Sequence, residues 1–285
     1  MSDIQIAQLY LNKIGFNGVF SPTLENLKTL LSLHIRSIPF GNISPLIHQK
    51  ISLQPSEIAN KLLIEKREGY CLEHSTLTKI ALQQLGYQTT NVLGRVYYRS
   101  TDFSDTPKLT HLVTLVTIEN ISYLFDPGFG GMTPATVLPL DQLNQTQETS
   151  LEPFRLVHVQ DSGIPSSALT DMQLMLQVCI ADEWSNIYAF NPQREFSHSD
   201  FEMANWYVST SPESKFTVNL MLAIAKGNTR YTMNNTLLRT HNRTHSTSKT
   251  IESSDEFENV LTNIFQIKVD SLDLTSLFQK IQNPT

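Results

Sequence analysis

The order in which helical and strand-like patterns follow one another is the feature that most constrains how this chain can fold. Before Gly86, apolar residues recur at the spacing of one helical face. After Gly86, short runs rich in β-branched and aromatic residues predominate, and from about Phe201 onward the two patterns are mixed. A doubly wound parallel sheet needs strands and helices that alternate, so this order favours an α+β fold.

Several segments show the periodicity and the boundary residues of helices. In the first, Ile6, Leu9, Tyr10 and Ile14 share one face, and Gly15 is a suitable end. Proline is tolerated in the first turn of a helix, and the residue before a proline tends to leave the helical conformation. On these grounds, further helices are expected from Ser21-Pro22 to Ile38, from Pro55 through Leu62 to about Ile64, from Cys71 to Leu85, and from Glu256 to Phe265.

Strands are expected where β-branched and aromatic residues cluster between polar segments. The strongest patterns lie at Val92–Tyr98, Leu112–Ile118 and Ile121–Phe125. Weaker strand patterns occupy Phe154–Val159, Leu174–Ile180, Ile187–Phe190, Leu220–Ala225 and Leu237–Thr240, and loops are expected at Asp161–Ser167, Asn191–Ser199 and Asn242–Ser254.

Composition and charge argue against several classes of protein. Hydrophobic residues make up 40% of the 285 residues, which is enough for a sizeable core, and the formal net charge is −6. An acidic chain is poorly suited to a phosphate backbone, so no nucleic-acid partner is expected. Two cysteines cannot form a disulfide framework, and the chain has no apolar signal core. Because it also lacks an apolar run of about 20 residues, a cytoplasmic protein without a membrane partner is expected.

Cys71 is the first candidate for chemistry because it lies at the start of an expected helix. Unpaired N–H groups and the helix dipole at that end favour an anion, and the thiolate is the form of cysteine that attacks carbonyl carbon. Most free cysteines are small buried hydrophobic residues, so this alternative stays open until Cys71 has a partner. Cys179, in the largely apolar run Leu174–Ile180, fits core packing.

The register of one hairpin supplies a partner for Cys71. If residues 119–120 form a two-residue turn, Ile118 pairs with Ile121, and His111 and Asp126 become diagonal neighbours on one face of the sheet. A carboxylate that accepts a histidine ring N–H is one half of a nucleophilic triad. A slip of one residue would place the two side chains on opposite faces, and any hairpin could bring such a pair together by chance.

Two further groups of residues carry weaker signals. The loop Gly128–Gly131 would let main-chain N–H groups approach a ligand closely, but it lacks the spacing of the common nucleotide motifs, so a plain turn is the simpler interpretation. Cys71, Glu73 and His74 suggest a metal centre only if a second pair of ligands exists. His241 and His245 are four residues apart, but they lie in a polar region rich in Thr and Ser that fits a solvated loop, so no metal site is expected.

Residues 67–75, REGYCLEHS, resemble the active-site stretch of the arylamine N-acetyltransferases, which is usually written Arg-Gly-Gly-x-Cys-x-Glu-x-Asn. Four more segments are similar to motifs of this family and occur in the same order, so that the resemblance spans about residues 38–216. They are residues 38–43 (IPFGNI, against Ile-Pro-Phe-Glu-Asn-Leu), 110–112 (THL), 126–131 (DPGFGG) and 204–216 (ANWYVSTSPESKF, which contains Ser-Thr-Ser-Pro-x-Ser-x-Phe).

The resemblance implies an architecture and a catalytic triad. The family has an N-terminal helical bundle, a central β-barrel and a C-terminal α/β lid, with a cysteine-protease-like arrangement of Cys, His and Asp. Matched motif by motif, Cys71 would be the nucleophile, His111 the base and Asp126 the carboxylate that orients it. The three parts would span residues 1–86, 87–200 and 201–285.

The resemblance also implies a reaction of xenobiotic metabolism. An acetyl group would pass from acetyl-CoA to a thioester on Cys71, and then to an arylamine, arylhydroxylamine or arylhydrazine, in a ping-pong sequence. The partners would be small molecules, with acetyl-CoA as cosubstrate and no permanently bound cofactor, and the oligomeric state is not predicted. Phe40, Phe129 and Phe216 would line the acceptor pocket, and Thr110, Gly128, Gly130 and Gly131 would contact CoA.

The chain departs from the family pattern at three positions of these motifs. Glu68 stands where the family has Gly, Ser75 where it has Asn, and Gly41 where it has Glu. A carboxylate at position 68 would disfavour the thiolate or narrow the pocket, unless it pairs with Arg67 or a lysine, in which case Cys71 is little affected. The loss of a carboxylate at Gly41 would reshape the pocket floor. These changes are expected to affect acceptor specificity and rate more than the class of reaction.

Three other functions stay open at this point. A homologue with the same triad could form an amide within a tethered polyketide chain, and a cysteine hydrolase could use the triad with water as the acceptor. A binding protein would need no chemistry, and the intact set of Cys71, His111 and Asp126 argues against it. Incubation with acetyl-CoA, with and without an arylamine, distinguishes a hydrolase from a transferase.

Overall fold

The first helices form where apolar faces predict them in the computed structural model, which describes residues 4–283. Helix α1 (Ile4–Ile14) ends at Gly15, whose φ of +72° suits glycine. Helix α2 (Leu24–Ser37) starts later than the Ser21-Pro22 position expected for it. The reason is that the side chain of Thr23 accepts a hydrogen bond from the Asn26 N–H at 3.3 Å and so caps the helix.

The remaining helices of the first third lead to the nucleophile candidate. The expected helix from Pro55 is confirmed, although its second half is a wider π-helical turn. The expected helix from Cys71 is confirmed as well, with Gly86 at a φ of +93° just beyond its end. The segments are α3 (Ile43–Leu46), α4 (Pro55–Ala59), its π-helical continuation η1 (Asn60–Ile64) and α5 (Cys71–Gln84).

A seven-stranded antiparallel sheet follows, and it forms the nearly closed barrel that the family resemblance implied. Its strand order is β5-β4-β3-β2-β8-β7-β6. The segment after β5 reaches β6 through a hydrogen bond from the Asn144 N–H to the Leu156 carbonyl at 2.8 Å and a bridge between Gln147 and Phe154. The strands are β2 (Gln88–Val96), β3 (Leu109–Ile118), β4 (Ile121–Phe125), β5 (Leu138–Pro139), β6 (Phe154–His158), β7 (Leu174–Ile180) and β8 (Glu183–Phe190), with short 3-10 turns at Val159–Asp161 and Ser166–Ala168.

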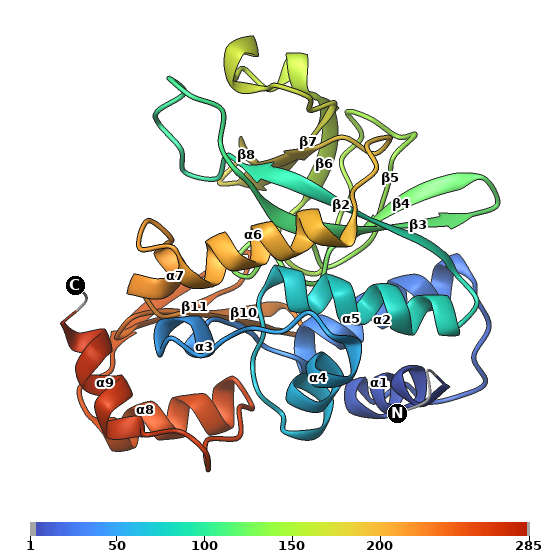
Figure 1. Cartoon of the computed structure of the whole chain (residues 1–285). Coiled ribbons are helices and arrows are strands. Elements are labelled where there is room, and N and C mark those ends of the chain that lie inside the picture. The colour runs from blue at the N-terminus through green and yellow to red at the C-terminus, as the bar shows by residue number, and fades with distance from the viewer. Residues whose placement is uncertain (1–3, 284–285) are drawn as a thin grey trace.

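A second antiparallel sheet joins the beginning and the end of the chain. Its order is β1-β9-β10-β11-β12, and Phe40 of β1 pairs with Ala223 of β9. In Figure 1 this sheet lies below the barrel, and α6 crosses between the two. The expected first part, residues 1–86, and the expected third part, residues 201–285, therefore share one sheet. The division of the chain into three parts at residues 86 and 200 stays a prediction. The elements are β1 (Phe40–Gly41), α6 (His198–Thr210), α7 (Lys215–Val218), β9 (Met221–Lys226), β10 (Thr229–Asn234), β11 (Leu237–His241), β12 (Ser246–Thr250), α8 (Ser254–Asn259), η4 (Val260–Ile264) and α9 (Leu274–Gln282).

The C-terminal third contains the largest differences from the sequence-based expectation. The expected loop Asn242–Ser254 is wrong, because β12 lies within it as an edge strand whose five residues are all exposed. Such a strand has no buried face and therefore no alternating pattern to reveal it. The expected loop Asn191–Ser199 is shorter, because α6 begins at His198 with a cap from Ser197. Neither α6, α9 nor β10 was predicted.

The hydrophobic core places α5 at the centre of the molecule. One cluster of buried residues joins α1, α2 and α5 to β2, β3 and β4, and includes Leu31, Leu72 and Leu112. Helix α5 also packs directly on β2 and β3. Cys71, the first residue of α5, is therefore buried next to the barrel strands. Within residues 4–283, no helix is both long and apolar enough to span a membrane.

Candidate active site

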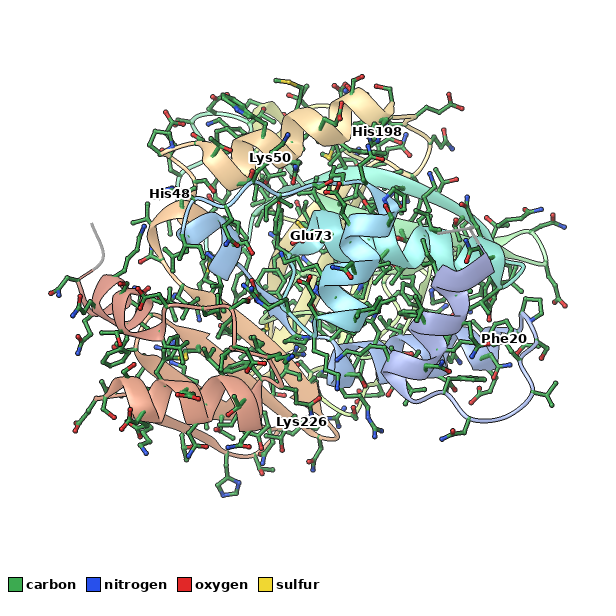
Figure 2. All side chains as sticks on the ribbon, turned by 60° about the horizontal axis from the view of Figure 1, so that its bottom comes forward. Phe20, His48, Lys50, Glu73, His198 and Lys226 are labelled. Atoms are coloured by element: carbon green, nitrogen blue, oxygen red, sulfur yellow. The ribbon has the colours of Figure 1, made fainter. Side chains whose placement is uncertain are left out.

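The start of α5 is held by buried charged groups around Cys71. The Tyr70 N–H donates to Glu73 Oε2 at 3.1 Å, and Lys61 Nζ lies 2.7 Å from Glu73 Oε1. Figure 2 shows Glu73 on α5 near the middle of the molecule. Cys71 is the first residue of the helix and is 5% exposed, with its Sγ 3.6 Å from the Thr110 carbonyl oxygen on β3. The thiol is thus fixed between a helix N-terminus and the barrel.

The β3–β4 hairpin has the predicted register. Glu119 and Asn120 form the two-residue turn with φ of +50° and +66°, as a type I′ turn requires, and Ile118 pairs with Ile121. His111 Nε2 donates to Asp126 Oδ2 at 2.9 Å, and both side chains are buried. The local hairpin therefore brings together the histidine and aspartate that the sequence singled out.

Asp126 accepts two more hydrogen bonds, one from a residue that sequence reasoning missed. The Tyr188 hydroxyl donates to Oδ2 at 2.8 Å, and the Gly128 N–H donates to Oδ1 at 2.9 Å. Tyr188 lies on β8, within a strand that was expected. No sequence signal places that strand near Asp126, because β8 reaches the site through its pairing with β2.

The surroundings of His111 favour its charged form. Burial alone lowers the pKa of His111, but the negative charge of Asp126 and the hydrogen bonds to Asp126 and Cys71 outweigh burial and raise the pKa to about 10. Because Asp126 occupies Nε2, Nδ1 is the ring nitrogen left for Cys71. An imidazolium beside the sulfur is the arrangement that stabilises a thiolate.

The three predicted pocket phenylalanines lie in two groups. Phe40 and Phe216 pack edge to face with ring centroids 6.1 Å apart, and Tyr70 lies 5.8 Å from Phe216. Phe129 instead packs edge to face on His111, with ring centroids 5.1 Å apart. A Cβ at Gly130 would lie 2.8 Å from Phe40, so the glycine loop touches the first group. Their role as an acceptor pocket stays a prediction.

The glycine loop after β4 runs close to Cys71. A Cβ at Gly128 would lie 2.9 Å from the Cys71 Cα, whereas one at Gly131 would make an ordinary 3.5 Å contact with Thr232. Thr110, whose carbonyl faces Cys71, also lines a cavity of about 290 Å³ together with Lys108, Arg194 and Tyr207. The predicted CoA contacts of this loop and of Thr110 stay untested, although Gly128 lies close to the Cys71 backbone.

The departures from the family motif have defined partners. Glu68 Oε2 lies 3.2 Å from Arg67 Nε, and Glu68 Oε1 accepts from the Ser44 N–H at 3.3 Å. This is the second of the two expected alternatives, in which the carboxylate pairs with Arg67. Ser75 donates its hydroxyl to the Leu112 carbonyl at 2.6 Å and ties α5 to β3.

Comparisons with known proteins agree on one family. A family model described as N-acetyltransferase matches residues 23–274. An arylamine N-acetyltransferase of Mycolicibacterium smegmatis is 32% identical over 266 residues, which cover 92% of each chain. The chain belongs to this family. It is therefore an acyltransferase, as the sequence predicted. An arylamine N-acetyltransferase of Mycobacterium tuberculosis is 34% identical over 235 residues, which cover 81% of this chain and 78% of that one.

Solved structures of the family share the fold. The arylamine N-acetyltransferase of Mycobacterium marinum superposes with a TM-score of 0.88 at 33% identity, covering 96% of this chain and 98% of that one. A second structure of the M. marinum protein, in complex with CoA, has a TM-score of 0.87 and the same coverage. These neighbours confirm the α+β fold and its barrel.

Proposed function

We propose that this arylamine N-acetyltransferase forms an acetyl thioester on Cys71 and passes the acetyl group to an arylamine, arylhydroxylamine or arylhydrazine. The observation that carries the proposal is the buried hydrogen bond between His111 and Asp126, together with the Cys71 Sγ at 3.6 Å from the carbonyl of Thr110, the residue before His111. His111 Nε2 is 2.9 Å from Asp126, and both Asp126 and Cys71 raise the pKa of His111. The complex of the M. marinum relative with CoA supports acetyl-CoA as the cosubstrate.

In the first half-reaction the thiolate of Cys71 attacks the thioester carbonyl of acetyl-CoA. The carbon–sulfur bond to CoA then breaks, and His111 gives its proton to the departing CoA sulfur. The negative charge on the carbonyl oxygen is stabilised by N–H groups at the start of α5, which have no acceptor within the helix. One such donor contributes on the order of 3 kcal/mol to the transition state.

In the second half-reaction the arylamine nitrogen attacks the acetyl carbon. Neutral His111 takes a proton from that nitrogen, the carbon–sulfur bond to Cys71 breaks, and the N-acetyl product leaves the thiolate paired with imidazolium again. An aromatic amine suits this site because its weakly basic nitrogen stays unprotonated at neutral pH. Its flat ring would be buried against Phe40, Phe129 and Phe216, which we propose as the acceptor pocket.

Residues beside Cys71 are suited to bind CoA. Thr110 and the loop of Gly128, Gly130 and Gly131 would hold the arm of CoA that ends at Cys71, since the Thr110 carbonyl lies 3.6 Å from the Cys71 Sγ and Gly128 lies against the Cys71 backbone. Lys108 and Arg194, on the cavity next to Thr110, would suit its phosphates. We also retain residues 201–285 as a lid that keeps water from the thioester, and a cytoplasmic location.

Intact mass spectrometry after brief exposure to acetyl-CoA tests the thioester. The wild type is expected to gain one acetyl group and to lose it when an aryl hydrazine is added. Cys71→Ala should not be labelled, whereas the control Cys179→Ala should be labelled like the wild type. Failure to label folded wild type, or equal labelling of Cys71→Ala, would contradict the proposal. Rapid loss of the acetyl group without an amine would indicate a hydrolase.

A further inference from the structure

We propose that Glu68 is a positioning residue, and that it supplies from the segment before α5 the carboxylate that the family motif carries at position 41. The sequence shows Gly41 where the motif has Glu and Glu68 where the motif has Gly. The structure makes these two departures a single exchange, because the two residues are in contact across the bridge between β1 and Gly69.

Gly41 lies so close to Glu68 that a side chain at position 41 would enter the same space. A Cβ at Gly41 would lie 2.7 Å from the Glu68 Cγ, 2.9 Å from its Cβ and 2.5 Å from the Leu222 Cδ2. Contacts this short are essentially never seen, and both Gly41 and Glu68 are buried, so neither can move aside into solvent. The Leu222 Cδ2 is the end of a flexible side chain and can turn aside, whereas the Glu68 Cβ cannot, so the site has room for a side chain from position 41 or from position 68, but not from both.

The space that Glu68 fills is bordered by groups that favour a carboxylate. Its carboxylate pairs with Arg67 Nε at 3.2 Å, and the two side chains are 0% and 8% exposed. The same carboxylate accepts from the Ser44 N–H at 3.3 Å. A buried guanidinium needs a carboxylate nearby, because breaking such a pair leaves an uncompensated charge. Glu68 thus connects the start of α3 to the segment that leads into Cys71.

The backbone shows what this carboxylate positions. The Gly41 N–H donates to the Gly69 carbonyl at 2.7 Å, and the Gly69 N–H donates to the Pro39 carbonyl at 3.3 Å. Gly69 lies two residues before Cys71, and Phe40 lies between Pro39 and Gly41, the two residues that are hydrogen-bonded to Gly69. The Arg67–Glu68 pair therefore helps to hold β1, which carries Phe40, against the segment that leads into Cys71.

The exchange is not fully equivalent. Arg67 Nη2 is buried and has no hydrogen-bond partner among the described residues, and Nη1 reaches only the Ser271 hydroxyl at 3.3 Å. A carboxylate from position 68 engages Nε alone. A glutamate at position 41 would approach the same guanidinium from β1, across the bridge to Gly69, so that exchanging the two residues keeps a carboxylate beside Arg67.

The test is a double-mutant cycle with Gly41→Glu, Glu68→Gly and the double variant, together with Glu68→Gln and the exposed control Glu57→Gln. Each single cycle variant is expected to lower the Tm by about 5–10 °C, because a buried arginine loses its partner or two side chains compete for one space. The double variant should return to within about 3 °C of the wild type. Glu68→Gln should lower the Tm, and Glu57→Gln should not.

Two functional readouts distinguish a positioning role from a merely stabilising one. Below the Tm of every variant, Glu68→Gly is expected to raise the acceptor KM about tenfold through displacement of Phe40, and the double variant should restore it. The rate at which iodoacetamide labels Cys71 should likewise differ from the wild-type rate in Glu68→Gly and return to it in the double variant.

The acceptor KM alone rests on the proposed function. The Tm and the labelling rate test the exchange even if no acetyl transfer occurs. A double variant that shows only the sum of the single losses would overturn the proposal. Wild-type behaviour of Glu68→Gln in all three measurements would do the same.

Discussion

At the residue scale, Asp126 connects three parts of the site through hydrogen bonds. Its two oxygens accept from His111, Tyr188 and the Gly128 N–H, all within 2.9 Å. One carboxylate thereby fixes the orientation of the imidazole and the position of the loop that passes Cys71. Because the pKa of His111 depends on this charge, the proposed pairing of its imidazolium with Cys71 would depend on it too.

Replacing Asp126 by Asn removes the charge but keeps the shape of the side chain. The pKa of His111 is expected to fall, because the attraction that outweighs burial is lost, and less imidazolium will be available to pair with Cys71. The rate of acetyl-Cys71 formation should fall on the order of 10²- to 10⁴-fold. Rapid-quench mass spectrometry measures this rate, and circular dichroism checks the fold. A folded variant within threefold of the wild type would refute this role of Asp126.

Replacing Tyr188 by Phe removes one hydrogen bond to Asp126 and keeps the ring that packs on His111, with centroids 4.5 Å apart. A hydrogen bond to a charged acceptor contributes about 1.5–3 kcal/mol, so kcat should fall by about 10- to 100-fold, with little change in acceptor KM. Tyr97 is a matched control, since its buried hydroxyl donates to the Ala168 carbonyl away from the site. Tyr97→Phe should lower stability but not kcat, and equal kcat losses in both variants would argue against a specific role for Tyr188.

At the element scale, the loop after β4 and the first turn of α5 pack too closely for an added methyl group. Gly128→Ala would bring a Cβ within 2.9 Å of the Cys71 Cα and 3.1 Å of the His74 Cβ. The loop and helix must separate, and a shift of about 1 Å at a reacting group can cost about 100-fold in rate. We expect kcat/KM to fall at least about tenfold, as steady-state kinetics can measure.

Gly131→Ala is the control for this prediction within the same loop. Its Cβ would meet only Thr232 at 3.5 Å, and no positive φ restricts the position. Because Gly131 is itself a proposed CoA contact, the two variants are compared without CoA, by the rate at which iodoacetamide labels Cys71. Gly131→Ala should stay within about twofold of the wild-type rate, since an ordinary van der Waals contact requires no movement, whereas Gly128→Ala should depart from it. If both alanine variants changed the labelling rate equally, the proximity of Gly128 to Cys71 would not be the cause.

At the scale of the whole molecule, a buried chain of hydrogen bonds connects α1, α2 and α5. The Gly69 carbonyl can only accept, so His74 Nε2 donates to it at 3.0 Å. His34 Nε2 then donates to His74 Nδ1 at 2.7 Å, and the Tyr10 hydroxyl donates to His34 Nδ1 at 3.1 Å. Each histidine is needed in its neutral form, and burial lowers the pKa of His74 to about 4 and that of His34 well below its usual value.

The buried hydrogen bonds of His34 and His74 predict that the protein loses stability in mild acid. The unfolded state binds protons on these histidines below about pH 6.5, whereas folded His74 does so only near pH 4. The stability that neutral His74 contributes is therefore complete above pH 6.5 and is lost as the pH falls towards 4. The slope is about 1.4 kcal/mol per pH unit for one such histidine.

Urea unfolding between pH 7.5 and pH 5 measures this contribution. His74→Gln retains a donor and an acceptor but cannot titrate, so its free energy of unfolding should fall less steeply with decreasing pH than that of the wild type. The exposed residue His158 provides a control, because His158→Gln should keep the wild-type slope. Identical slopes for His74→Gln and the wild type would show that His74 is not held neutral.

Local sequence was sufficient to predict that His111 lies beside Asp126 and that Cys71 begins a helix. The turn at Glu119-Asn120 determines the register of β3 and β4, and the period of two along a strand then places His111 and Asp126 on one face. The start of α5 at Cys71 was equally readable, because periodicity and the stop at Gly86 involve residues close in the chain. These features depend on interactions across a few residues, which a single sequence displays directly.

Only the tertiary structure decided how distant segments meet. The approach of β8 brings Tyr188 to Asp126, and the pairing of β1 with β9 crowds Gly41 against both Glu68 and Leu222. The exposed strand β12 exists through its backbone pairing with β11. None of these contacts leaves a periodic pattern, because they join residues far apart whose meeting depends on how whole sheets close and stack. The sequence by itself therefore determined the reacting groups and their local elements, and the packing of the sheets decided which further side chains surround them.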